Sequence, residues 1–362
     1  MRALVLSGGE GSRLRPLTHT SAKQLIPVAG TPILFHALQA VADAGIREVG
    51  IVVGQTGDEV RAAAGDGSRW GVEITYIPQE APLGLAHAVL TAREFVAGQP
   101  FLMYLGDNLL PEGLTTFVGE FERTRPDAQI FLARVPEPER FGVVELDGER
   151  VVRLVEKPRE HVSDLALVGV YLFDDSILDA AASLEPSWRG EYEITEAIQW
   201  LVDHGKTVRA QMVEGWWKDT GKPDDLLEAN RIMLALLPGS IEGDVDAATR
   251  IEGTVVIGPG AKITGSILRG PISIGSDTIV DGSIVGPDVS IERGCRVLDC
   301  EVGDSIVMEG CSITGVRRLE GSILGRGVEV RHATTAGNAA AEGLAGGSHR
   351  LILGDHSRVE TD

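Results

Sequence analysis

The chain has 362 residues, 43% of them hydrophobic and 24% charged, which is typical of a folded globular protein with two domains. Its formal net charge is -20, and so acidic a surface repels phosphate backbones, which argues against a nucleic-acid partner. The N-terminus lacks a signal-peptide pattern and no run of 18 apolar residues predicts a membrane span, so we expect a cytoplasmic protein with no membrane partner.

The first half of the chain alternates apolar runs with helical patterns. Strands are predicted at residues 2–7, 48–54, 73–78 and 101–107. Thr31-Pro32 and Gly45 are typical of the start and the end of a helix between the first two strands. This alternation predicts a Rossmann-like α/β domain, with a mixed, mainly parallel sheet covered by helices on both faces.

The loop after the first predicted strand is rich in glycine and ends in an arginine, as Gly8-Gly9-Glu10-Gly11-Ser12-Arg13. Glycines let backbone N–H groups approach phosphate oxygens, and an arginine can add a bidentate contact. The loop lacks the ending of a Walker A loop and the third glycine of a Rossmann fingerprint. Taken by itself, it is equally consistent with a simple turn between a strand and a helix.

The residues after this loop extend the pattern from Leu6 to Pro32, as LSGGEGSRLRPLTHTSAKQLIPVAGTP. This stretch resembles the signature of sugar-1-phosphate nucleotidyltransferases, G-G-x-G-x-R-L-x-P-L-T followed by P/A-K-x-L-x-P-V. The resemblance implies a loop that wraps a nucleoside triphosphate. Its implied nucleotide-binding residues are Gly8, Gly9, Gly11, Ser12 and Arg13. It also implies that Arg13 and Lys23 are catalytic, because they would hold the phosphates and neutralise the leaving pyrophosphate.

The segment PQEAPLGLAHAV follows the third predicted strand and contains Gln79 and Gly84. It resembles the family segment that reads a pyrimidine base through a glutamine amide and a glycine backbone. An amide can donate and accept hydrogen bonds at once, which suits a base edge. Without the resemblance, Gln79 would be interpreted as an ordinary polar loop residue.

Two aspartates far apart in the sequence, Asp107 and Asp219, are candidate metal ligands. Asp107 ends a buried strand in LGDN, where α/β sheets bind ligands, and Asp219 lies in WKDTG. Both segments resemble metal-binding motifs of the family, which implies Mg²⁺ held by two carboxylates, substrate phosphates and water. A turn residue and a helix cap are the simpler interpretations of the two side chains.

A predicted hairpin carries RFGVV and VEKP, which resemble the family motifs E-R-[FY]-G-V and E-K-P. The resemblance implies that Gly142 and Glu156 contact sugar hydroxyls. It also implies that Lys157 is catalytic, since it would bind the sugar phosphate as a compact cation. An exposed hairpin with ordinary surface charges is the alternative.

The segments LVGVYLFD and WRGEYEIT match the same family further along the chain. By resemblance, they place Gly169, Tyr171 and Arg189 near the hexose phosphate. Glu191 and Glu193 also have a simpler interpretation, as acidic residues at the N-terminus of the next helix.

After about residue 240 the sequence changes to a six-residue repeat. Ile251, Ile257 and Ile263 lie six positions apart, and glycines recur between such residues. This period predicts a left-handed hexapeptide β-helix, in which each coil has three short strands and buries an aliphatic ladder. A β-sandwich with glycine-rich turns is the alternative. We predict a nucleotidyltransferase domain at 1–239 and a β-helix domain at 240–362.

The role of this second domain is open between a structural and an enzymatic one. Hexapeptide β-helices often house acyltransferases, which usually need a basic histidine, and residues 251–330 contain none. We therefore expect a structural or oligomerising domain in a homo-oligomer. Cys295, Cys300 and Cys311 lack C-x-x-C spacing and are predicted to be small core residues without zinc or disulfides.

The resemblance covers residues 1 to about 237 and, together with the repeat, is closest to the long-form glucose-1-phosphate thymidylyltransferases. It implies a Mg²⁺-dependent, in-line attack of glucose 1-phosphate on the α-phosphorus of dTTP, which gives dTDP-glucose and pyrophosphate. UTP or another triphosphate is the alternative donor. A non-catalytic, sugar-nucleotide-binding regulatory subunit is a further alternative, but it should have lost at least one of the expected charged residues.

Overall fold

The computed structural model describes residues 1–333 and 348–361, and the chain divides into two compact units. Unit 1 contains Met1–Glu10 and Ile33–Asp219, and unit 2 contains Gly11–Pro32 and Thr220–Asp362. The chain therefore passes between the units three times, and two of these crossings lie in segments that resemble family motifs. The domain boundary predicted after residue 239 stays a prediction.

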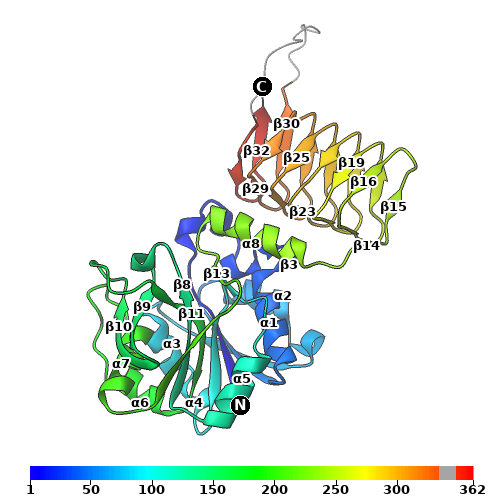
Figure 1. Ribbon diagram of the computed structural model, residues 1–362. Coiled ribbons are helices and arrows are strands. Elements are labelled where there is room, and N and C mark those ends of the chain that lie inside the picture. Colours follow the sequence, from blue (N-terminus) through cyan, green and yellow to red (C-terminus); the bar gives the residue numbers. More distant parts are fainter. Residues whose placement is uncertain (334–347, 362) are drawn as a thin grey trace. The chain divides into compact units, whose positions relative to one another are not determined.

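Unit 1 is built on a nine-stranded mixed sheet with the order β5-β4-β1-β6-β11-β8-β12-β10-β9 (Figure 1). Its strands are β1 (Arg2–Ser7), β4 (Glu48–Val53), β5 (Glu73–Pro78), β6 (Phe101–Leu105), β8 (Ala128–Arg134), β9 (Gly142–Asp147), β10 (Arg150–Glu156), β11 (Leu165–Phe173) and β12 (Val208–Met212). β5, β4, β1 and β6 are mutually parallel, whereas β11 runs antiparallel to β6 and β8. The predicted α/β class with a mixed sheet is confirmed.

Helices cover both faces of this sheet (Figure 1). They are α1 (Ile33–Asp43), α2 (Gly57–Ala64), α3 (Leu85–Thr91), α4 (Arg93–Val96), α5 (Thr115–Thr124), α6 (Ser176–Ala182) and α7 (Ile194–Asp203), with the 3-10 turns η4 (Ser68–Trp70) and η5 (Pro138–Arg140). One core joins α3, α4, α6 and α7 to the sheet through residues such as Leu4 and Ile130. On the other face Phe117 of α5 packs against Phe131, with ring centroids 4.3 Å apart. No helix among the described residues is long and apolar enough to cross a membrane.

The start of α1 differs from the sequence-based prediction. Thr31 and Pro32, expected to begin the helix, form the short strand β3 (Thr31–Pro32), which pairs with β2 (Pro27–Val28). The helix begins only at Ile33 because this hairpin engages the two preceding residues. Unlike α1, the hairpin belongs to unit 2.

Unit 2 consists mainly of three parallel sheets whose strands succeed one another coil by coil (Figure 1). The first sheet contains β14 (Ser240–Ile241), β17 (Val255–Ile257), β20 (Ile272–Ile274), β23 (Val289–Ile291), β26 (Ile306–Val307), β29 (Ile323–Leu324) and β31 (Ile352–Leu353). The second contains β15 (Asp244–Val245), β18 (Lys262–Thr264), β21 (Ile279–Asp281), β24 (Arg296–Leu298), β27 (Ser312–Thr314), β30 (Glu329–His332) and β32 (Arg358–Thr361). The third contains β16 (Arg250–Glu252), β19 (Ile267–Arg269), β22 (Ile284–Val285), β25 (Glu301–Gly303) and β28 (Leu319–Glu320). This arrangement confirms the predicted hexapeptide β-helix and is not that of the alternative, a β-sandwich.

Stacked side chains hold the coils of the β-helix together. Ile257, Ile274 and Ile291 pair in register and are almost fully buried, forming one rung of the aliphatic core. A polar ladder runs beside such rungs, in which Ser266 Oγ accepts from the backbone N–H of Ser283, 17 residues along the chain. A coil of this length keeps the predicted ladder although it is one residue shorter than three hexads. The three cysteines are buried and free, as predicted.

The segment Gly11–Pro32 is packed against other parts of unit 2. It contains the 3-10 turns η1 (Ser12–Leu14), η2 (Leu17–His19) and η3 (Lys23–Leu25), and α8 (Pro223–Ala235) lies against its β2 strand. Ala29 donates its backbone N–H to Asn230 Oδ1 of α8 at 2.8 Å. Thr20 Oγ1 donates to Asp355 Oδ2 at 2.7 Å, and Arg326 Nη1 donates to Ser21 Oγ at 2.9 Å. The last coils of the β-helix therefore help to fix this segment.

Candidate functional site

Two of the residues predicted to bind the nucleotide lie at the carboxyl ends of parallel strands in unit 1. Gly8 follows β1, and Gln79 follows β5. A Cβ atom added to Gly8 would lie 3.1 Å from Gln79 Oε1 and 3.6 Å from the backbone N of Gly54. The structure thus brings Gly8 and Gln79 together at an edge of the sheet where α/β proteins bind ligands.

Gly84 is held against the backbone that precedes α7. Its φ of +105° favours glycine, and an added Cβ atom would lie 2.5 Å from the carbonyl oxygen of Tyr192. On the other side, Gln79 Nε2 lies 3.5 Å from the Gly84 carbonyl oxygen and 2.9 Å from His87 Nδ1. Gln79, Gly84 and His87 therefore form one cluster. His87 was missed by the sequence analysis, although its place three residues after Gly84 puts it in the first turn of α3.

A small antiparallel ladder in unit 1 brings together the segments that carry the two predicted metal ligands. β13 (Lys218–Asp219) pairs with β7 (Asn108–Leu109), so that Asp219 lies opposite Asn108, the residue that follows Asp107. Asn108 Nδ2 donates to Asp107 Oδ1 at 3.1 Å, and Asn108 Oδ1 accepts from Trp217 Nε1 at 2.6 Å. Opposed residues in such a ladder have Cα atoms about 5 Å apart. Two carboxylates on adjoining segments would supply the hard oxygen donors that Mg²⁺ prefers.

The two aspartates were the metal ligands expected from the sequence, with substrate phosphates and water completing the coordination. Within the described residues, no group of three or more His, Cys, Asp or Glu side chains could hold a metal ion. Mg²⁺ is commonly bound by only one or two carboxylates together with phosphates and water. The pair of Asp107 and Asp219 therefore suits a metal that arrives with a phosphorylated substrate.

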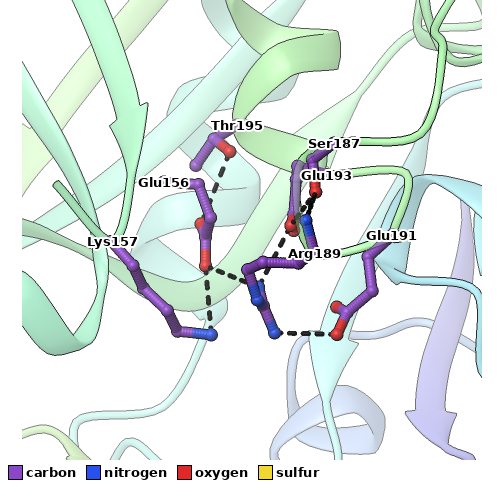
Figure 2. Close-up of polar contacts among 7 residues, drawn as sticks. All are labelled: Glu156, Lys157, Ser187, Arg189, Glu191, Glu193 and Thr195. Carbon is purple, nitrogen blue, oxygen red and sulfur yellow. Dashed lines mark hydrogen bonds and ion pairs between the residues drawn. The ribbon is translucent and has the colours of Figure 1, made fainter.

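Three of the predicted sugar-phosphate residues, Glu156, Lys157 and Arg189, lie in a network of charges centred on Arg189 (Figure 2). Arg189 Nη1 lies 3.0 Å from Glu193 Oε1 and 3.5 Å from Glu156 Oε1, and its Nη2 lies 2.7 Å from Glu191 Oε1. Lys157 Nζ lies 3.3 Å from the same Glu156 oxygen. Three carboxylates thus surround one guanidinium, while the ammonium of Lys157 borders the network.

Two backbone features border this network, a tightly packed glycine at position 142 and a positive φ at Lys157. A Cβ atom on Gly142 would lie 3.0 Å from Glu156 Oε2 and 2.5 Å from Thr195 Cγ2, so only glycine fits. Lys157 has a φ of +43°, which is unusual for a residue with a side chain, and its N–H donates to the Phe141 carbonyl at 3.0 Å. Such conformations concentrate at functional sites, where the surrounding structure enforces them.

Tyr171 lies deeper than the other members of the predicted set. It is buried in β11 and stacks against Phe173, with ring centroids 5.7 Å apart. Burial raises the pKa of its hydroxyl, and the charge of Glu156 raises it further. The Tyr171 hydroxyl therefore remains neutral at physiological pH.

Of the remaining predicted nucleotide-binding and catalytic residues, Gly9 belongs to unit 1, and Gly11, Ser12, Arg13 and Lys23 belong to unit 2. A Cβ atom on Gly11 would lie 2.9 Å from Lys23 Cβ. A Cβ atom on Gly221 would similarly lie 2.8 Å from Arg13 Nη2. Each cation therefore rests against a glycine of the same unit, and Ser12 opens the 3-10 turn that contains Arg13.

Comparison with known proteins decides the family. Residues 2–235 match the family model described as Nucleotidyl transferase. The chain belongs to the nucleotidyl transferase family. It is 52% identical over 361 residues to a glucose-1-phosphate thymidylyltransferase from Streptomyces griseus, with 99% of each chain covered. It is 51% identical to a protein of the same name from Streptomyces antibioticus, again with 99% of each covered.

A solved structure of this nucleotidyl transferase family supports the same assignment. It is a crystal structure of a protein assigned as a glucose-1-phosphate thymidylyltransferase from Bacillus anthracis, in complex with sucrose. The two share 33% identity and a TM-score of 0.62 over 66% of this chain and 98% of that one. About two thirds of this nucleotidyl transferase therefore corresponds to almost the whole Bacillus chain.

Gly169 provides a test of the geometry around the two aspartates. A Cβ atom there would lie 2.6 Å from Asn108 Cγ, so we expect Gly169→Ala to displace Asn108 and the adjacent Asp107 and to lower kcat by about tenfold or more. Gly119 of α5 has no atom within 4 Å of the same point, and Gly119→Ala is the matched control. Equal steady-state rates for both variants would contradict the assignment of Asp107 to the metal site.

Glu193 is the most buried carboxylate of the network. Burial raises the pKa of this carboxyl above its usual value of 4.5, and the charge of Glu156 adds to the effect. Below that usual value both folded and unfolded chains are protonated there, whereas at higher pH the folded state must hold a costly charge. We expect Glu193→Gln to gain stability relative to the wild type as pH rises from about 4 to about 7.

Urea unfolding of both proteins across this pH range measures the effect. Glu191→Gln, which changes a more exposed carboxylate on the same arginine, is the control. A stability difference between Glu193→Gln and wild type that does not change with pH would show that the charge carries no such cost.

Proposed function

We propose that the chain transfers a thymidylyl group from dTTP to glucose 1-phosphate and releases pyrophosphate. The observation that carries this proposal is full-length similarity at 51% and 52% identity to two glucose-1-phosphate thymidylyltransferases. The clusters around Gln79, Asp107 and Glu156 support it, since the reaction needs a base site, a metal site and a sugar-phosphate site.

The proposed reaction is a direct in-line displacement. An oxygen of the sugar phosphate attacks the α-phosphorus of the triphosphate, and the bond from that phosphorus to the β-phosphate oxygen breaks to release pyrophosphate. The attacking oxygen already carries negative charge, so no protein nucleophile or general base is required. Catalysis then depends on positioning the two substrates and stabilising negative charge.

Each charged residue has one proposed task. Asp107 and Asp219 would hold Mg²⁺, which would screen the α-phosphate from the approaching anion. Arg13 and Lys23 would bind the triphosphate and stabilise the charge that develops on pyrophosphate. Lys157 would bind and align the sugar phosphate. Gly142, Gly169 and Glu156 would contact the sugar, with Arg189 fixing Glu156 through their ion pair of 3.5 Å.

We extend the proposal to the assembly and the location of the protein. We expect a homo-oligomer, in which the regular β-helix provides surface for self-association. We expect it to act in the cytoplasm, because nucleoside triphosphates and sugar phosphates are charged metabolites that do not cross membranes unaided.

Pyrophosphate release tests the proposed function. The purified protein is incubated with Mg²⁺ and glucose 1-phosphate, with dTTP, UTP, GTP, CTP and ATP in parallel. We expect dTTP to give the highest kcat/KM. A clear preference for UTP or another triphosphate would keep the reaction and overturn the donor. Tight dTTP binding without turnover would favour the regulatory-subunit alternative.

A further inference from the structure

The amide of Gln79 is held on its nitrogen side by other residues of unit 1. Its Nε2 donates to His87 Nδ1 at 2.9 Å and lies 3.5 Å from the Gly84 carbonyl oxygen. The opposite atom, Oε1, faces Gly8 at the carboxyl end of β1. The Gly84 carbonyl is an acceptor, and His87 Nδ1 is one in the tautomer protonated at Nε2, so these contacts favour one of the two possible orientations of the amide.

This orientation depends on the protonation state of one histidine nitrogen. Nδ1 of His87 can accept a hydrogen bond only when it carries no proton, which requires the neutral tautomer protonated at Nε2. The ring itself is held by stacking on Tyr192, with centroids 6.2 Å apart and an interplanar angle of 28°. The backbone of Tyr192 is fixed in turn, because its N–H donates to Leu83 and its carbonyl accepts from Ala86.

A fixed amide has a consequence for the choice of base. Thymine and uracil carry an N–H at ring position 3, whereas cytosine has a lone pair there. Gln79 Oε1 is an acceptor, so it suits the N–H and repels the lone pair. If the amide turned over, it would present N–H groups and would favour cytosine instead.

We propose that His87 is a specificity-determining residue, which holds the Gln79 amide so that the site accepts thymine and uracil and rejects cytosine. His87 acts through Gln79 and is a positioning residue without a contact to the base. The inference rests on the proposed function, in which Gln79 reads the base. The fixed Gln79 amide would distinguish thymine and uracil, which carry an N–H at ring position 3, from cytosine. It would not distinguish thymine from uracil.

The ratio of kcat/KM for dTTP to that for dCTP tests this inference. His87→Phe keeps a ring that can stack on Tyr192 and removes the acceptor, so we expect the ratio to fall about tenfold. His87→Gln restores an acceptor and should recover most of the ratio. The KM for glucose 1-phosphate should stay unchanged in both variants, which a general loss of structure would not allow.

Two controls make the result specific. His204→Phe changes another histidine that stacks on an aromatic ring, Trp200 at 3.7 Å, and should leave the ratio unchanged. In a Gln79→Ala background, His87→Phe should have no further effect on the ratio, because its partner is absent. An unchanged ratio in His87→Phe, or an equal effect with and without Gln79, overturns the inference.

Failure of the proposed function gives a different result. If the wild type turns over no triphosphate, that function is overturned, and the same ratio is measured as equilibrium binding of dTTP and dCTP. Binding that prefers dTTP in the wild type and loses the preference in His87→Phe still supports the role of His87. Binding without preference in the wild type overturns it.

Discussion

Asp107→Asn should lower kcat by about 10³-fold without unfolding the protein. The substitution keeps the size of the side chain and its place before β7, but it replaces a charged oxygen donor with a neutral amide that binds Mg²⁺ weakly. The neighbouring Asp219 lies on the paired strand and would be left as a single carboxylate. Pyrophosphate release over a Mg²⁺ titration measures both the maximal rate and the concentration of Mg²⁺ that gives half of it.

A matched variant separates metal binding from general charge effects. Asp164→Asn removes a carboxylate whose side chain is 59% exposed, in the same unit, and should leave the rate unchanged. Circular dichroism and thermal melting establish that Asp107→Asn is folded. A near-normal rate for Asp107→Asn at every Mg²⁺ concentration would exclude this aspartate as a metal ligand.

Arg13→Gln should lower kcat by about 10²- to 10³-fold, the second large effect we expect. A guanidinium beside the leaving pyrophosphate stabilises charge that grows in the transition state, whereas the amide of glutamine supplies no positive charge. The structure places Arg13 Nη2 against Gly221, so that the adjacent backbone leaves room for a planar guanidinium. The KM for glucose 1-phosphate should change little, because the lost interaction concerns the other substrate.

Arg15 provides a control two residues away on the same loop. Both arginines are exposed, but only Arg13 stands at the family's motif position, so Arg15→Gln should keep at least half of the wild-type rate. Arg13→Lys should recover part of kcat, because it restores charge without the bidentate geometry. Equal losses for Arg13→Gln and Arg15→Gln would indicate a general electrostatic effect of the loop.

Much of the fold could be predicted because two hydrophobic patterns are visible in the sequence, continuous apolar runs and a six-residue repeat. Continuous apolar runs such as residues 3–6 match strands buried on both faces of the sheet. The six-residue spacing of Ile251, Ile257 and Ile263 predicted a β-helix, which the parallel sheets confirm. The 17-residue length of several coils, such as those that pair Ile257, Ile274 and Ile291, was less apparent, since a shortened turn changes the spacing without changing which side chains point inward.

The candidate site was predicted through local motifs, and its missed features depend on contacts that only the folded chain creates. His87 belongs to the candidate site because α3 brings its ring within hydrogen-bond distance of Gln79. The residue types alone do not predict this contact. Asn108 was part of a motif, but its link to Trp217 needs the pairing of β7 with β13. The positive φ of Lys157 is likewise imposed by its surroundings, since lysine has no preference for that conformation.

The bonding of Thr20 and Ser21 to Asp355 and Arg326 bears on how far the protein can be shortened or recombined. The β-helix is not a detachable module, because its last coils supply hydrogen-bond partners to the segment that carries Arg13 and Lys23. A chain cut near residue 239 would keep the Asn230 contact to Ala29 and lose these others. A chimera that exchanges the tail must therefore carry over a matching partner for residues 20 and 21, or redesign that segment so that it holds its shape alone.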